Sequence, residues 1–148
     1  WLRFLDLQIP FLLRHRDNFR DLETWMIWGN IAINHQQNLN KSFDSSVYKQ
    51  QIILKNYFKK VVDIKIVRGV NASSISDISG IPRATVIRKL RWLVKQKLVK
   101  KNKHLEYLLS YKGKLNDKIE SNFLNNQVCV AEFLTDYFDY YKNSNFLP

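Results

Sequence analysis

Large apolar and aromatic residues recur at helical spacing near both ends of the chain. In residues 2–15 and 18–37, with Pro10 near the start and Asp17 as a candidate cap, this pattern predicts one long or two shorter helices. In residues 115–142 apolar positions return at spacings of three, four and seven, which is typical of a long amphipathic helix. So much apolar surface in the terminal segments indicates burial, either within the chain or against a second copy of it.

Shorter elements are predicted between these ends. Residues 46–62 place apolar side chains on one face and lysines off it, which predicts a helix. The β-branched residues 64–69 predict a brief strand, and residues 98–109 predict two short strands about a polar turn near Asn102. The predicted fold class is therefore mainly α with a small β hairpin.

Residues 74–97 predict two helices joined by a tight turn. Ser74 and Asp77 form a capping-box pattern that opens a very short helix, and Gly80 ends it. Pro82 suits the first turn of a longer helix, predicted to run to about Lys97. On a helical wheel the longer helix has an apolar face and a basic face. The small core predicted from this region contains Ile75, Ile78, Ile81, Val86, Ile87, Leu90, Leu93 and Val94.

Positive charge is concentrated in the middle of the chain. The net charge is +11 over 148 residues, yet residues 1–40 carry four basic and four acidic groups, and residues 121–148 carry one and three. Residues 41–120 carry nineteen basic and six acidic groups, and residues 80–103 hold nine Lys and Arg with no acidic residue. A genomic preference for Lys codons explains many lysines but not this confinement. We therefore expect a binding surface for a polyanion.

Several function classes are disfavoured by the sequence. No apolar run is long enough for a membrane span, no signal-peptide pattern is present, and the single cysteine, Cys129, favours a reducing compartment, so we expect a soluble cytoplasmic protein. The histidines and Cys129 lack the spacings of a zinc site. No phosphate-binding glycine loop, nucleophile elbow or paired-carboxylate signature is present. We therefore expect no enzyme activity, metal or cofactor.

Residues 75–93, ISDISGIPRATVIRKLRWL, resemble the helix-turn-helix of bacterial transcription regulators. The shared features are the short first helix, the turn glycine Gly80, the apolar Ile81 and the R-A-T-V-x-R opening of the second helix. Residues 98–115, LVKKNKHLEYLLSYKGKL, resemble a wing followed by the start of a C-terminal helix. Within them residues 108–115, LLSYKGKL, are similar to the segment that leaves the wing in MarR-type regulators. This wing is shorter and Lys-rich where MarR-type wings carry an Asp-Arg-rich motif. IclR-type and other winged families therefore remain open.

The resemblance implies roles for individual residues in binding double-stranded DNA. By position, Arg83, Ala84 and Arg88 match the places that face base edges. The implied phosphate contacts in the helices are Ser74, Thr85, Lys89, Arg91 and Lys95, with the backbone amides at the start of the short helix as a further anchor. At the wing, Lys101, Lys103 and His104 would reach an adjacent minor groove or its phosphates.

The resemblance also implies an organisation and a function. A winged helix-turn-helix domain over residues 44–112 would be flanked by dimerisation helices in residues 1–43 and 113–148. The protein would act as a homodimeric, sequence-specific transcription regulator on a short palindromic operator. A small-molecule effector could bind between the terminal helices and the DNA-reading heads. Two other classes stay open: a winged-helix protein–protein interaction module and an RNA-binding winged helix.

Overall fold

The structure, a computed structural model, describes residues 2–42, 68–110 and 112–143. Within these ranges the fold is mainly α, with five helices and a small antiparallel hairpin, as predicted. The elements are, in chain order, α1 (Leu2–Phe19), α2 (Leu22–Ser42), α4 (Ala72–Ser79), α5 (Arg83–Lys95), β1 (Val99–Lys101), β2 (Tyr107–Leu109) and α6 (Leu115–Asn143). The predicted helix over residues 46–62 and most of the predicted strand over residues 64–69 lie outside the described residues.

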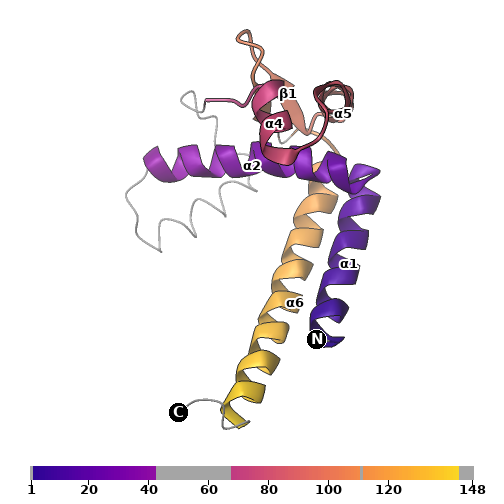
Figure 1. The fold of residues 1–148 in the computed structure, drawn as a ribbon, viewed down its shortest axis with the longest axis vertical. Helices are drawn as coiled ribbons and strands as arrows, with labels where there is room; N and C mark the ends of the chain where they lie inside the picture. The colour runs from indigo at the N-terminus through magenta and orange to yellow at the C-terminus, as the bar shows by residue number, and fades with distance from the viewer. Residues whose placement is uncertain (1, 43–67, 111, 144–148) are drawn as a thin grey trace.

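Helix α2 lies across the molecule and separates two groups of elements (Figure 1). On one side α1 and α6 run next to each other in opposite chain directions, away from α2; we call this pair the arm. On the other side lie α4, α5 and the β1–β2 hairpin, which we call the head. The arm therefore does not cover the side of the head that faces away from α2 (Figure 1).

The hydrophobic core lies mainly where α2 meets the head. Val86, Leu90 and Leu93 of α5 are fully buried, because spacings of four and three place them on one side of a helix. The other buried apolar residues are Phe19, Ile27, Ile31, Ile75, Ile81, Leu98, Val99, Tyr107, Leu109 and Ile119. Burying each large apolar side chain contributes about 1.5–3 kcal/mol. This core fixes which side of α5 is left for solvent.

Two members of the predicted core are placed differently. Ile78 is 69% exposed, because α4 turns only Ile75 of its two isoleucines toward α5. Val94, in the last turn of α5, is 38% exposed. The prediction that these two side chains are buried is wrong.

The turn between α4 and α5 forms much as the sequence predicts. Gly80 has a left-handed φ of 69°, a conformation that glycine adopts without steric cost, and its N–H donates to the Ser76 carbonyl at 2.9 Å. Pro82 directly precedes α5. The start of α4 differs from the prediction, because the helix begins at Ala72 and its cap is Asn71, whose Oδ1 accepts a hydrogen bond from the Ser74 N–H at 2.9 Å. An Asn cap of this kind satisfies a donor that the first helical turn leaves free.

The hairpin is built as predicted and gains one further pairing. Val99 lies opposite Leu109 and Lys101 opposite Tyr107 in the antiparallel register. Val70 also pairs with Tyr107, its N–H donating to the Tyr107 carbonyl at 3.1 Å and its carbonyl accepting at 2.8 Å. The residue just beyond the predicted strand therefore extends the hairpin by one antiparallel bridge.

Candidate nucleic-acid interface

The outward side of α5 is basic. Ala84, Arg88, Arg91 and Lys95 are exposed, and spacings of four, three and four keep them on the side opposite the core. Arg83 is exposed in the first turn of the same helix. Among the described residues, no carboxylate forms an ion pair with Arg83, Arg88 or Arg91. These guanidinium groups are held out toward solvent by a helix whose other side is fixed in the core.

Lys89, which the resemblance assigns to a phosphate contact, does not belong to this outward side. The residue is 8% exposed, and its Nζ lies 2.7 Å from Asp21 Oδ1 and 3.1 Å from Glu23 Oε2. It also donates to Thr24 Oγ1 at 3.4 Å. Asp21 directly precedes α2 and Glu23 lies in its first turn, and Asp21 is 68 residues from Lys89 in the chain, so the pattern within α5 could not indicate these carboxylates. Lys89 joins α5 to α2.

Asp21 has a second role at this junction. Its Oδ1 accepts hydrogen bonds from the Thr24 N–H at 2.7 Å and the Thr24 hydroxyl at 2.8 Å, so it caps the start of α2. Burial acts to raise the pKa of the Asp21 carboxyl, but the hydrogen bonds from Lys89 and Thr24 outweigh burial and lower the pKa. Asp21 therefore keeps its negative charge to a lower pH than an ordinary aspartate does.

The β1–β2 hairpin presents further basic side chains on the head. Lys101, Lys103 and His104 are all exposed. The loop is ordered by Asn102, whose Oδ1 accepts hydrogen bonds from the N–H groups of His104 and Glu106, both at 2.9 Å. These bonds hold the loop in one shape and leave its basic side chains on the outside.

The acidic side chain of the loop is engaged internally. Glu106 Oε2 accepts from Asn102 Nδ2 at 2.9 Å and from the Gly69 N–H at 3.3 Å. The hydrogen bond from Asn102 is the main cause that lowers the pKa of Glu106. The Glu106 carboxylate thus holds Gly69 against the hairpin.

The two remaining predicted phosphate contacts are less exposed to solvent. Thr85 and Ser74 are half-buried, and the Ser74 N–H is occupied by the Asn71 cap. One donor of the backbone anchor predicted at the start of α4 is therefore already used within the head.

Sequence reasoning missed a basic residue at the junction of α1 and α2. The Arg20 guanidinium carbon lies 5.8 Å from the centre of a Trp92 ring of α5. Together with Arg88 these residues line a hollow of about 300 Å³. Arg20 belongs to a segment with no net charge, and its proximity to α5 depends on how α2 packs. The predicted helix over residues 18–37 includes Arg20, so the sequence pattern held no signal that this residue lies at a corner between two helices.

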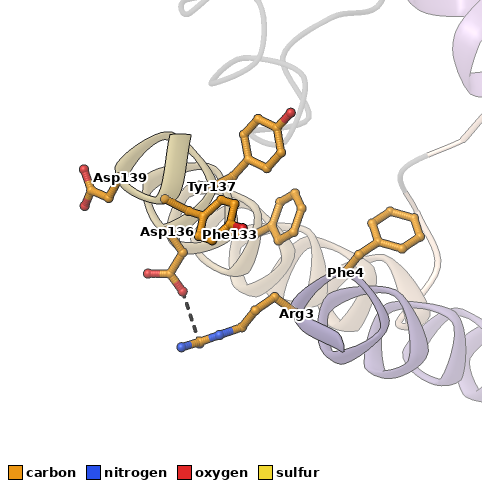
Figure 2. Close-up of a pocket in the computed structure, with 7 residues that line it drawn as sticks. Arg3, Phe4, Phe133, Asp136, Tyr137 and Asp139 are labelled. Carbon is orange, nitrogen blue, oxygen red and sulfur yellow. Dashed lines mark ion pairs between the residues drawn. The ribbon is translucent and has the colours of Figure 1, made fainter. Parts of the chain in front are cut away.

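A larger hollow lies at the free end of the arm (Figure 2). It measures about 700 Å³ and is lined by Arg3, Phe4, Phe133, Asp136, Tyr137, Asp139 and Tyr140. Arg3 Nη1 lies 3.1 Å from Asp136 Oδ2, which ties the start of α1 to the end of α6 (Figure 2). The effector site was predicted between the terminal helices and the head, and this hollow lies elsewhere.

The described residues hold no group of three His, Cys, Asp or Glu side chains that could bind a metal ion. No helix in the described ranges is both long and apolar enough to cross a membrane.

Comparison of the chain with protein-family models, curated proteins and solved structures finds no match.

Proposed function

We propose that this protein is a winged helix-turn-helix regulator that binds double-stranded DNA and reads it with α5. The observation that carries the proposal is the division of α5 into two sides. One side is fixed in the core through Val86, Leu90 and Leu93. The other side holds out Arg88 and Arg91, which no carboxylate of the described residues neutralises. A helix with this distribution of charge is suited to a polyphosphate partner.

The shape of the head supports the same proposal. An α-helix with its side chains is about 10–12 Å across, and the major groove of B-form DNA is about 12 Å wide. The arm lies on the far side of α2, so it does not obstruct an approach to α5 (Figure 1). The hairpin brings Lys101, Lys103 and His104 to the same head, where they fit the role of a basic wing.

The proposed contacts divide into two classes. Arg83, Ala84 and Arg88 would face base edges, where Arg can bind guanine O6 and N7 through two hydrogen bonds and Ala can touch a thymine methyl. Phosphate contacts are assigned to Arg91, Lys95, Lys101, Lys103 and His104, with Ser74 and Thr85 as half-buried candidates. Lys89 is left out because it is engaged with α2.

We further propose that the arm forms a homodimer. Its helices expose many large apolar side chains, among them Leu2, Ile9, Val128, Leu134, Phe138 and Tyr140. A two-fold dimer of winged helices would place two α5 helices about 34 Å apart, one turn of DNA, and would bind a short palindromic operator. The hollow at the end of the arm borders this surface, and a small-molecule effector there could change the spacing of the two heads.

The test of the proposal is binding-site selection with the purified protein and random duplex DNA. We expect enrichment of a short, roughly palindromic sequence, with an affinity that falls steeply as salt rises. Equal binding to every duplex would contradict sequence-specific regulation.

Competition with duplex RNA of the same length separates the RNA-binding alternative, which predicts that RNA displaces the DNA. A partner protein held with a salt-insensitive affinity, without DNA binding, would favour the interaction-module alternative.

A further inference from the structure

A hollow of about 300 Å³ lies where the corner between α1 and α2 meets α5. Its walls are Arg20, Asp21, Thr24, Arg88, Lys89 and Trp92. The corner itself is formed by Arg20 and Asp21, the two residues between α1 and α2. The hollow therefore lies beside Arg88, at the edge of the α5 side that we propose reads DNA.

The charges of this hollow do not cancel. Lys89 is neutralised by Asp21 and Glu23, at 2.7 Å and 3.1 Å. Neither Arg20 nor Arg88 forms an ion pair within the described part of the chain. Three cationic side chains, Arg20, Arg88 and Lys89, thus stand against two carboxylates, which leaves a net charge of +1 and favours an anionic ligand there.

Arg20 is held in place for such a ligand. Its guanidinium lies over the Trp92 ring at 5.8 Å, a cation–π contact that limits the freedom of a long side chain. Its backbone φ is 70°, in the left-handed region that glycine and asparagine occupy more readily than arginine. A residue with an unfavourable backbone conformation is thus placed where its charge faces the hollow.

The position of the hollow beside α5 indicates which kind of anion it would bind. Trp92 follows Arg88 by four residues, so the two side chains lie on the same side of the helix. When α5 enters a major groove, the sugar-phosphate strand that borders the groove passes along this edge of the helix. Guanidinium groups bind phosphate oxygens through paired, charge-assisted hydrogen bonds.

We infer that Arg20 binds a backbone phosphate of the DNA at the edge of the groove that α5 enters, acting from the α1–α2 corner outside the helix-turn-helix. This inference rests on the proposed function. It assigns the hollow to a phosphate group and makes the corner part of the DNA-binding surface.

The test compares Arg20→Asn with Arg20→Lys. Asparagine tolerates the left-handed backbone, so the first variant removes the charge without adding strain, and the second keeps the charge. The matched control is Arg16→Asn, because Arg16 is an exposed arginine of α1 that already pairs with Asp17 at 3.0 Å. Affinity for the selected duplex and for an unrelated duplex is measured over a series of salt concentrations.

We expect Arg20→Asn to weaken binding to both duplexes by about the same factor, roughly fivefold to tenfold at low salt. The slope of log affinity against log salt should become shallower by about 0.9, the value for one phosphate contact. Arg20→Lys should recover most of the slope, and Arg16→Asn should match wild type. A slope that Arg20→Asn leaves unchanged would overturn the inference while duplex binding by wild type still stands. Wild type that binds no duplex would overturn the proposed function and the inference together.

A free oxyanion has the same chemistry as a backbone phosphate, and thermal unfolding separates the two. Inorganic phosphate and chloride are compared at equal ionic strength. We expect phosphate to shift the melting temperature of wild type and Arg20→Asn by the same amount. If phosphate stabilises wild type alone and the DNA salt slope is unchanged in Arg20→Asn, the hollow serves a free anion and the DNA assignment is wrong.

Discussion

The Nζ atom of Lys89 lies 2.7 Å from Oδ1 of Asp21, and this ion pair joins α5 to the beginning of α2. The Lys89 side chain is 9% exposed, whereas the Asp21 side chain is 46% exposed. The carboxylate therefore keeps part of its hydration, and the ammonium depends on it for a counter-charge. This arrangement contributes to fixing the side of α5 that faces outward.

The first prediction concerns this ion pair. Asp21→Ala removes both the main partner of Lys89 and the cap of α2, and we expect it to lower the free energy of unfolding by about 1–3 kcal/mol. Glu23→Ala removes only the longer ion pair and should cost less than about 1 kcal/mol. Urea denaturation of the two variants and wild type at one protein concentration checks this. Equal losses of unfolding free energy in the two variants would contradict a larger contribution from Asp21 than from Glu23.

The second prediction uses two isoleucines of α4. Ile75→Ala should lower the free energy of unfolding by about 2–5 kcal/mol, because Ile75 is fully buried between α4 and α5. Ile78→Ala should change it by no more than about 0.5 kcal/mol, because Ile78 is largely exposed. Because both residues are isoleucines of α4, the comparison of the two variants controls for residue type and for the helix. A large loss in Ile78→Ala would contradict the placement of α4.

The sequence was sufficient for features that depend on local pattern. The spacing of Val86, Leu90 and Leu93 indicated the buried side of α5, and Gly80 marked the turn before it. The hairpin followed from a polar turn between two short apolar segments. Each of these features is decided by residues within one or two turns of each other, where helical period and turn chemistry act.

Features that depend on α2 could not be predicted. Lys89 looks like another outward cation until α2 places Asp21 and Glu23 beside it. Arg20 belongs to an electrically balanced segment and gains its contact with Trp92 only when the α1–α2 corner packs next to α5. Tertiary contacts between distant segments override the local pattern at these positions. The predicted domain boundaries stay predictions, although α2 shares the core of the head.

The third prediction concerns pH. His15 stacks on Trp25 with ring centres 4.6 Å apart, and its buried Nδ1 has no hydrogen-bond partner among the described residues. Burial, with a smaller effect from the charge of Arg14, lowers the pKa of His15 below its ordinary value. The unfolded chain therefore takes up a proton at a higher pH than the folded protein does.

The expected consequence is a loss of stability on acidification. Stability from this site is full above about pH 6.5, the ordinary histidine pKa, and decreases as the pH falls below it. His15→Phe keeps an aromatic ring without the titration and should show a weaker pH dependence. Urea denaturation at pH 7.5 and pH 5.5 measures the difference. An unchanged pH dependence would exclude His15 as its source and point instead to His35, a buried histidine whose pKa is also lowered by burial.

The fourth prediction tests the arm as a dimer interface. Phe138 is 57% exposed near the end of α6, so Phe138→Asp should leave the fold of one chain intact. In the proposed dimer the new charge would be buried without a partner, and sedimentation should show a monomer. Leu105→Asp places the same charge on an exposed apolar residue of the hairpin loop and should remain dimeric. A dimer in both variants would place the interface elsewhere.

The central claim, that the outward side of α5 reads DNA sequence, is tested most directly by repeating binding-site selection with Arg88→Ala and Lys103→Ala. We expect Arg88→Ala to lose about 1–3 kcal/mol of specific binding and to accept several bases at one position of each half-site. Lys103→Ala should weaken binding to every sequence alike and keep the selected motif. A motif that Arg88→Ala leaves identical to that of wild type would contradict the account.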